Sequence, residues 1–221
     1  MSIKDIQEMY EQGTIRTIEN DTDTFKFGCN QCGQCCTVNV EVILTPYDVF
    51  KIAKGLNINS TGLLQSALRI FIGSNTNMPI VIINPQKIAG LSVCPFLIPD
   101  ISKHKMRCSI QRFKPFNCAI YPLGKVTELS KDDKTSKVKY IVQDTDCSCS
   151  NAKEWTLKEW KDKFDLKEAD EVSEVWTNFI RENIDKFNLI TTISEALQDK
   201  SYRTLISIIS VSYTHLTLPT I

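Results

Sequence analysis

The chain has 221 residues, and its 26 Lys+Arg residues balance its 26 Asp+Glu residues, so no basic field points to nucleic acid or to anionic lipid. It is 42% hydrophobic and 24% charged and has no apolar run long enough to cross a bilayer, which is typical of a globular domain and argues against a membrane protein. Charges interrupt the first thirteen residues, which argues against a signal peptide, and we expect a cytoplasmic protein.

The N-terminal part is predicted to be a polar helix and lead over residues 1–24. A second helix is predicted to begin at Pro46, because Thr45 is placed to cap it and Asp48 to close a capping box. The apolar face of this helix runs to Leu56, and Gly55 and Asn57 should weaken the helix at this end.

The middle of the chain contains further periodic segments. Residues 63–72 predict another helix, and residues 78–84 predict a strand bounded by prolines. Residues 124–129 and 137–143 predict a hairpin whose charged loop is 130–136.

Helices are predicted to follow residue 154. Thr156 can cap one of them and Glu159 can complete a capping box, while Trp155 and Trp160 are spaced as a hydrophobic staple. A longer helix is predicted over residues 168–187, with its apolar residues on one side.

The last eleven residues, 211–221, resemble the translation of a sequencing adapter, and we expect the native part to be about 210 residues long and to lack its true C-terminus. His215 lies in this tail, which leaves His104 as the one native histidine. A two-histidine zinc site or a nucleophile activated by histidine is therefore not expected.

Nine cysteines in a chain expected to be cytoplasmic indicate metal ligands or redox groups, because a reducing cytosol disfavours disulfides. Four of them form the dense motif Cys29-x-x-Cys32-Gly33-x-Cys35-Cys36. Gly33 can adopt a positive φ, so a tight turn could direct backbone N–H groups to the thiolates. The spacing of the first three is the one that ferredoxin-type loops use for a [4Fe–4S] cluster.

Cys36 is the extra member of this motif. In an extended chain, adjacent side chains point to opposite sides, so Cys35 and Cys36 would not ligate the same atom. Two centres, or one thiol that exchanges as a ligand, are both open.

Three further cysteines, Cys94, Cys108 and Cys118, are dispersed among prolines that should hold them in rigid turns without a regular element. A basic run crosses the same stretch. It could offset thiolate charge and lower cysteine pKa values, or it could be a solvated surface loop. Its members are Lys103, Lys105, Arg107, Arg112 and Lys114.

We expect these thiols to converge on one site together with Cys147 or Cys149. An iron–sulfur cluster, [4Fe–4S] in type, is favoured because the thiols outnumber the four that one zinc needs, and zinc is the alternative. The predicted ligands are Cys29, Cys32, Cys35, Cys36, Cys94, Cys108, Cys118 and Cys147.

From about residue 25 to residue 176 the chain resembles the YkgJ-type cysteine-cluster family, described as a zinc- or iron-chelating domain. The matching segments are the eight-residue cysteine motif, Leu44-Thr45-Pro46-x-Asp48, Cys94-Pro95-Phe96-Leu97, Cys108-x-Ile110, Pro115-x-x-Cys118, Tyr121-Pro122-Leu123-Gly124, Asp146-Cys147 and Glu154-Trp155-Thr156 with Glu159-Trp160. The resemblance implies Cys147 rather than Cys149 as a ligand.

The chain departs from the family where the family carries arginine, at Lys114 and Ala119, so a bidentate arginine contact is lost at both places. A bacterial flagellin lysine methylase is similar to the family over the cysteine motif. This similarity implies methyl transfer as an alternative function, although no glycine-rich loop of the usual kind for S-adenosylmethionine is present.

These observations predict a small, loop-rich α+β cysteine-cluster domain over residues 25–150, braced by helices and a β-hairpin, with a helical extension over residues 151–210. We expect a metal-binding protein without a readable reaction. The alternatives are an iron–sulfur enzyme and a structural zinc module that binds a protein partner through its C-terminal helices.

Overall fold

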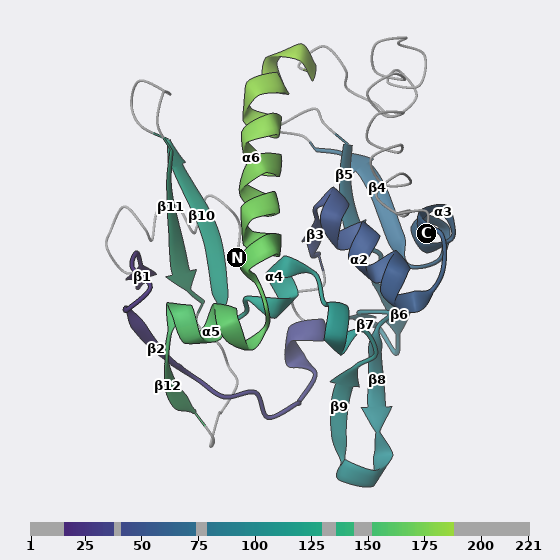
Figure 1. The fold of residues 1–221 in the computed structure, drawn as a ribbon. Helices are drawn as coiled ribbons and strands as arrows, with labels where there is room; N and C mark the ends of the chain where they lie inside the picture. The colour runs from purple at the N-terminus through teal and green to yellow at the C-terminus, as the bar shows by residue number, and fades with distance from the viewer. Residues whose placement is uncertain (1–15, 38–40, 74–78, 130–135, 144–151, 188–221) are drawn as a thin grey trace, which may run out of the picture. The chain divides into compact units, whose positions relative to one another are not determined.

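The computed structural model describes residues 16–37, 41–73, 79–129, 136–143 and 152–187, and these residues form a mixed α+β fold of helices and small antiparallel sheets (Figure 1). The predicted α+β class is confirmed. The chain divides into two compact units: Met1–Cys32 with Ala119–Lys167, and Gly33–Cys118 with Glu168–Ile221. No helix in the described part is both long and apolar enough to cross a lipid bilayer.

The first unit contains the predicted hairpin. Strands β10 (Leu123–Leu129) and β11 (Ser136–Val142) pair antiparallel, with Gly124 opposite Ile141, and this prediction is confirmed. Strand β1 (Thr17–Ile18) adds to β11, and the order is β1-β11-β10. Strand β2 (Thr24–Phe27) pairs with β12 (Lys153–Thr156). The predicted N-terminal helix lies outside the described residues.

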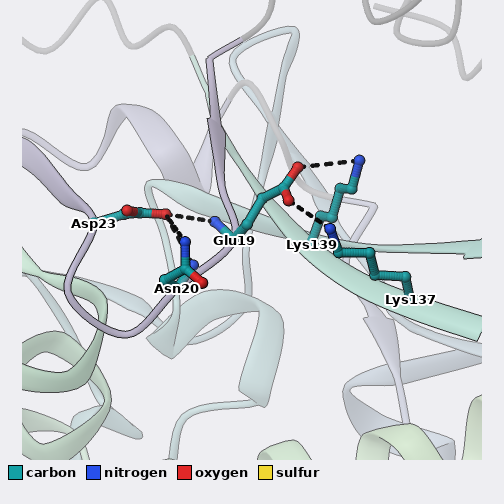
Figure 2. A network of polar contacts seen from close by, with 5 residues as sticks. All are labelled: Glu19, Asn20, Asp23, Lys137 and Lys139. Carbon is teal, nitrogen blue, oxygen red and sulfur yellow. Dashed lines mark hydrogen bonds and ion pairs between the residues drawn. The ribbon is translucent and has the colours of Figure 1, made fainter.

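A polar network joins β1 to β11 and closes the turn between β1 and β2 (Figure 2). The Glu19 carboxylate lies 2.6 Å from the Lys137 ammonium and 3.1 Å from that of Lys139. The Asp23 carboxylate accepts hydrogen bonds from the backbone N–H groups of Asn20 and Glu19, at 2.8 and 2.9 Å. Hydrogen bonds from the two lysines lower the pKa of Glu19, and those two backbone N–H groups lower the pKa of Asp23.

Helix α5 (Leu157–Lys163) begins as predicted. Thr156 and Glu159 form a reciprocal capping box, and the rings of Trp155 and Trp160 lie 5.1 Å apart across the helix start as a staple. Trp160 is buried, and its indole N–H donates to the Ile120 carbonyl at 3.0 Å. This tryptophan anchors the core of the first unit.

The second unit is built on helix α2 (Pro46–Leu56), whose predicted cap at Thr45 and capping box with Asp48 are confirmed. The helix ends at Leu56, with Asn57 as its C-cap in the left-handed region, as predicted. Glycine at position 55 is also needed for close packing, because a Cβ there would lie 2.5 Å from the Phe113 ring.

The predicted helix over residues 63–72 is half wrong. Helix α3 (Ser60–Ser66) ends early, and strand β4 (Leu68–Ile72) follows it. The sequence of β4 is rich in branched and aromatic residues, and it pairs with the predicted strand β5 (Pro79–Ile83). With β3 (Ile43–Leu44), the sheet order is β3-β5-β4. A shared apolar core lies under α2 and α3; it includes Leu44, Val49, Ile52, Leu63 and Ile83.

Between β5 and the end of this unit the chain forms more regular structure than the sequence predicted. The elements are β6 (Gln86–Ile88), β7 (Leu91–Val93), β8 (Leu97–Asp100), η2 (Ile101–Lys103), β9 (Lys105–Cys108), η3 (Gln111–Phe113) and α4 (Phe116–Ala119). Strands β6 and β7 form one hairpin, and β8 and β9 form another. The predicted long C-terminal helix is α6 (Lys167–Phe187).

Candidate metal centre

Five of the predicted ligands belong to the second unit, where four separate segments carry them. Cys35 and Cys36 lie on the short 3-10 helix η1 (Gln34–Cys36), and Cys94 lies just after β7. Cys108 ends β9, and Cys118 lies in α4. The last two therefore sit on regular elements, contrary to the prediction of turns alone. Cys94 is buried and Cys35 is exposed.

The predicted tight turn at Gly33 is present, and it sets the positions of the first two thiols. Gly33 has φ 81°, and its carbonyl accepts the Cys36 N–H at 2.9 Å. The sulfur atoms of Cys35 and Cys36 then lie 3.9 Å apart. The two thiols therefore do not point to opposite sides, as predicted for an extended chain, because the segment is a helical turn.

Backbone hydrogen bonds bring the next segment to this turn. The Cys94 N–H donates to the Cys36 carbonyl at 2.8 Å, and the two thiols are also hydrogen-bonded. The Leu97 N–H donates to the Cys94 carbonyl at 3.0 Å. Because Leu97 pairs with Cys108 across the β8–β9 hairpin, the register of this hairpin places Cys108 in the same neighbourhood.

Helix α4 supplies Cys118 and is held by residues from the start of the unit. The Phe116 N–H donates to Oδ1 of Asp48 at 2.8 Å, and the Asn117 side-chain amide donates to the Ile43 carbonyl at 3.0 Å. The sequence indicated only the capping role of Asp48. Nothing in its spacing could reveal a partner 68 residues away.

The thiols of Cys35, Cys36 and Cys94 form a hydrogen-bonded series. The hydrogen bond with Cys35 lowers the pKa of Cys36, but the hydrogen bond with Cys94, burial and neighbouring thiols outweigh this effect and raise that pKa to about 12. The hydrogen bond with Cys36 lowers the pKa of Cys94.

Cys35, Cys108 and Cys118 hold their protons more firmly than an ordinary cysteine does. The hydrogen bond between Cys35 and Cys36, together with partial covering of the Cys35 sulfur, raises the pKa of Cys35. Burial raises the pKa of both Cys108 and Cys118. The Lys114 ammonium opposes all three shifts. Within the predicted basic run, Lys114 is thus a residue whose charge acts on the thiols.

The remaining members of that run fit the surface-loop alternative better. Lys105, Arg107 and Arg112 are exposed, and Lys103 is exposed and lies 3.9 Å from Asp100. The sequence could not separate Lys105 and Arg107 from Lys114, because the alternation along β9 turns these two side chains to the side opposite Cys108.

Three of the predicted ligands remain predictions. Cys29 and Cys32 belong to the first unit and are exposed. Cys147, with its alternative Cys149, lies outside the described residues. The sequence did not reveal one neighbour of Cys29. Burial lowers the pKa of Lys163, which lies close enough to Cys29 that a thiolate there would raise this pKa, and the Lys163 ammonium lies 4.2 Å from the Trp155 ring centroid.

The donor set consists of thiols, which fit a soft metal. Two sulfurs on one zinc lie about 3.8 Å apart for Zn–S bonds of about 2.3 Å. The 3.9 Å between the Cys35 and Cys36 sulfurs matches this separation. Among the described residues, however, no three Cys, His, Asp or Glu side chains form a ready metal site. The protonated thiols hydrogen-bond one another, and a metal would have to displace those protons.

Comparison with known proteins gives the same chemistry. Residues 28–148 match the family model CxxCxxCC, described as "Putative zinc- or iron-chelating domain". The chain belongs to this family. The matched range includes Cys147 and ends before Cys149. No curated protein and no solved structure matches the chain.

Proposed function

We propose that this member of the CxxCxxCC family binds an iron–sulfur cluster through the thiols of Cys35, Cys36, Cys94, Cys108 and Cys118. One observation carries the proposal: these thiols come from four segments that backbone contacts bring together, with the Cys35 and Cys36 sulfurs 3.9 Å apart and the Cys94 N–H bonded to the Cys36 carbonyl at 2.8 Å. One buried cysteine can be explained as a small hydrophobic side chain, but five thiols brought together from four segments cannot.

The same thiols are suited to hold either metal of the family description. Thiolates bind zinc in closed four-ligand sites and bind iron in sulfur clusters. We favour the cluster because the second unit alone offers one thiol more than a four-cysteine zinc site uses. A cluster supplies one-electron transfer, whereas zinc supplies a cross-link. Cys29, Cys32 and Cys147 are proposed as additional ligands.

Anaerobic purification followed by absorption spectroscopy, with iron, sulfide and zinc analysis, tests the identity of the centre. We expect a coloured protein with iron and sulfide in about equal amounts. A colourless protein with stoichiometric zinc would reverse the choice of metal and leave thiolate binding intact. A chain that retains neither metal would contradict the proposed function.

Matched serine variants test the ligand set. Cys36→Ser and Cys94→Ser should each lower the metal content, because serine keeps the size of the side chain and removes the soft ligand. Ser66→Ala is a control in the same unit, since its hydroxyl donates to the Gly62 carbonyl inside α3. It should load metal like the unsubstituted chain.

A further inference from the structure

Asp48 makes a contact that its place in a helix cap does not require. The residue is 1% exposed. Its Oδ2 accepts the Thr45 N–H at 2.9 Å and the Thr45 hydroxyl at 2.8 Å, which completes the capping box of α2. Its other oxygen, Oδ1, turns away from that box and accepts the Phe116 N–H at 2.8 Å.

This second contact fixes the start of helix α4. A helix of four residues is too short to be stable by itself, and its first N–H groups have no partner within the helix. Asp48 satisfies one of them. The next residue, Asn117, is tied through its amide to the carbonyl of Ile43, on strand β3 just before the α2 cap. The first two residues of α4 are thus both held by the segment 43–48.

The residue after these two is Cys118. Its own N–H donates to the Pro115 carbonyl at 3.0 Å, which closes the turn. Because the helix is so short, the position of its thiol depends on the contacts that hold the helix in place. Metal ligands that are oriented by hydrogen-bonded neighbours commonly lose affinity when those neighbours are removed.

We propose that Asp48 is the positioning residue of Cys118, so that its buried carboxylate, anchored in the α2 cap, holds the helix that presents this thiol to the metal. This proposal rests on the proposed function. An ordinary capping residue would stabilise α2 and leave Cys118 unaffected, and a matched variant can separate the two roles.

The test compares Asp48→Ala and Asp48→Leu with Thr45→Ala in the full chain. Thr45→Ala removes the hydroxyl of the capping box but leaves Oδ1 of Asp48 bonded to Phe116. Alkylation of each cysteine is timed by mass spectrometry, in the metal-free chain and after addition of Zn²⁺ alone. The zinc affinity is measured by competition with a chelator.

Both Asp48 variants should speed alkylation of Cys118 at least about tenfold in the zinc-loaded chain, with Cys94 and Cys108 still protected, and should weaken zinc binding about 10- to 100-fold. Thr45→Ala should change the Cys118 alkylation rate and the zinc affinity by no more than about twofold. An equal effect of Thr45→Ala, or an unchanged Cys118 rate in the Asp48 variants, would overturn the proposal.

Two remaining outcomes are also decisive. If Asp48→Ala unfolds, Asp48→Leu decides, because its side chain fills nearly the same space and has no oxygen to accept the Phe116 N–H. Exposure of all five thiols alike in that variant would overturn a specific role for Cys118. If Zn²⁺ protects no thiol in the unsubstituted chain while the Asp48 variants still speed Cys118 alkylation, the proposed function fails and the hold of Asp48 on Cys118 stands.

Discussion

Gly33 is the residue at which the backbone and the candidate site depend most directly on each other. It adopts φ 81°, and a Cβ there would lie 3.0 Å from the Cβ and Cγ atoms of Met106 on β9. The sequence could predict the positive φ, because glycine within a cysteine motif is typical of a tight turn. It could not predict the close approach of Met106, which depends on how the β8–β9 hairpin folds over the turn.

Gly33→Ala should therefore destabilise the protein for two reasons. The left-handed conformation costs roughly 1–2 kcal/mol for a residue with a Cβ, and the contact with Met106 should add roughly 1–3 kcal/mol of overpacking. Gly90 is a matched control, because it has φ 82° and nothing within 4 Å of its Cβ position. Chemical denaturation should show a clearly larger loss for Gly33→Ala than for Gly90→Ala; equal losses would rule out the steric contribution.

At the scale of elements, the sequence predicted the structures that depend on local signals, but it did not predict strand pairing between distant segments. The two capping boxes, the staple and the β10–β11 hairpin were readable because each depends on residues near one another in sequence. The helix predicted over 63–72 failed in its second half, since pairing of Leu68 with Ile83 across the sheet outweighs the helical spacing. The hairpin that carries Cys108 was missed for a different reason, because its two strands have only four residues each and give a weak pattern.

The attachment of β1 to β11 should respond to acid. Because its lysine partners lower the pKa of Glu19, the carboxylate contributes stability above its unfolded pKa, which is close to 4.5, and that contribution is lost as pH falls through the folded value. Urea midpoints measured between about pH 6 and about pH 3 should fall more for the unsubstituted chain than for Glu19→Gln.

Two controls accompany this comparison. High salt should shrink the difference, because exposed charges are screened. Glu41→Gln should change the acid response less, since Glu41 is 77% exposed and lies 3.6 Å from Arg69. If Glu19→Gln titrates like the unsubstituted chain, the two lysines do not secure the edge strand.

At the scale of the whole molecule, the two units are interleaved along the chain. The first unit takes β12 and α5 from beyond residue 150, and the second unit takes most of α6. The sequence showed a change from cysteine-rich to helical composition near residue 150 and so predicted domains over 25–150 and 151–210. Composition cannot reveal that β12 returns to pair with β2. Those linear boundaries remain a prediction.

A chain that ends after residue 150 should therefore lose the fold of its first unit. It would lack the strand that pairs with β2 and the buried Leu157 and Trp160, and removal of one buried tryptophan alone costs about 3–5 kcal/mol. A chain that ends after residue 187 keeps these elements and is the control. Circular dichroism and hydrogen exchange at Phe25 and Phe27 would report the loss. Native protection in the shorter chain would instead support the linear domains.

The scattered origin of the five thiols also has a consequence for synthesis on the ribosome. Cys36 emerges early, whereas Cys118 follows about 80 residues later, which takes roughly 4–16 s at 5–20 residues per second. Cys94, which bonds to the Cys36 backbone, arrives late in that interval. During this time the nascent chain presents its vicinal thiols without the partners that surround them in the folded unit. A cell that makes this protein must keep those thiols reduced until the last of them has emerged.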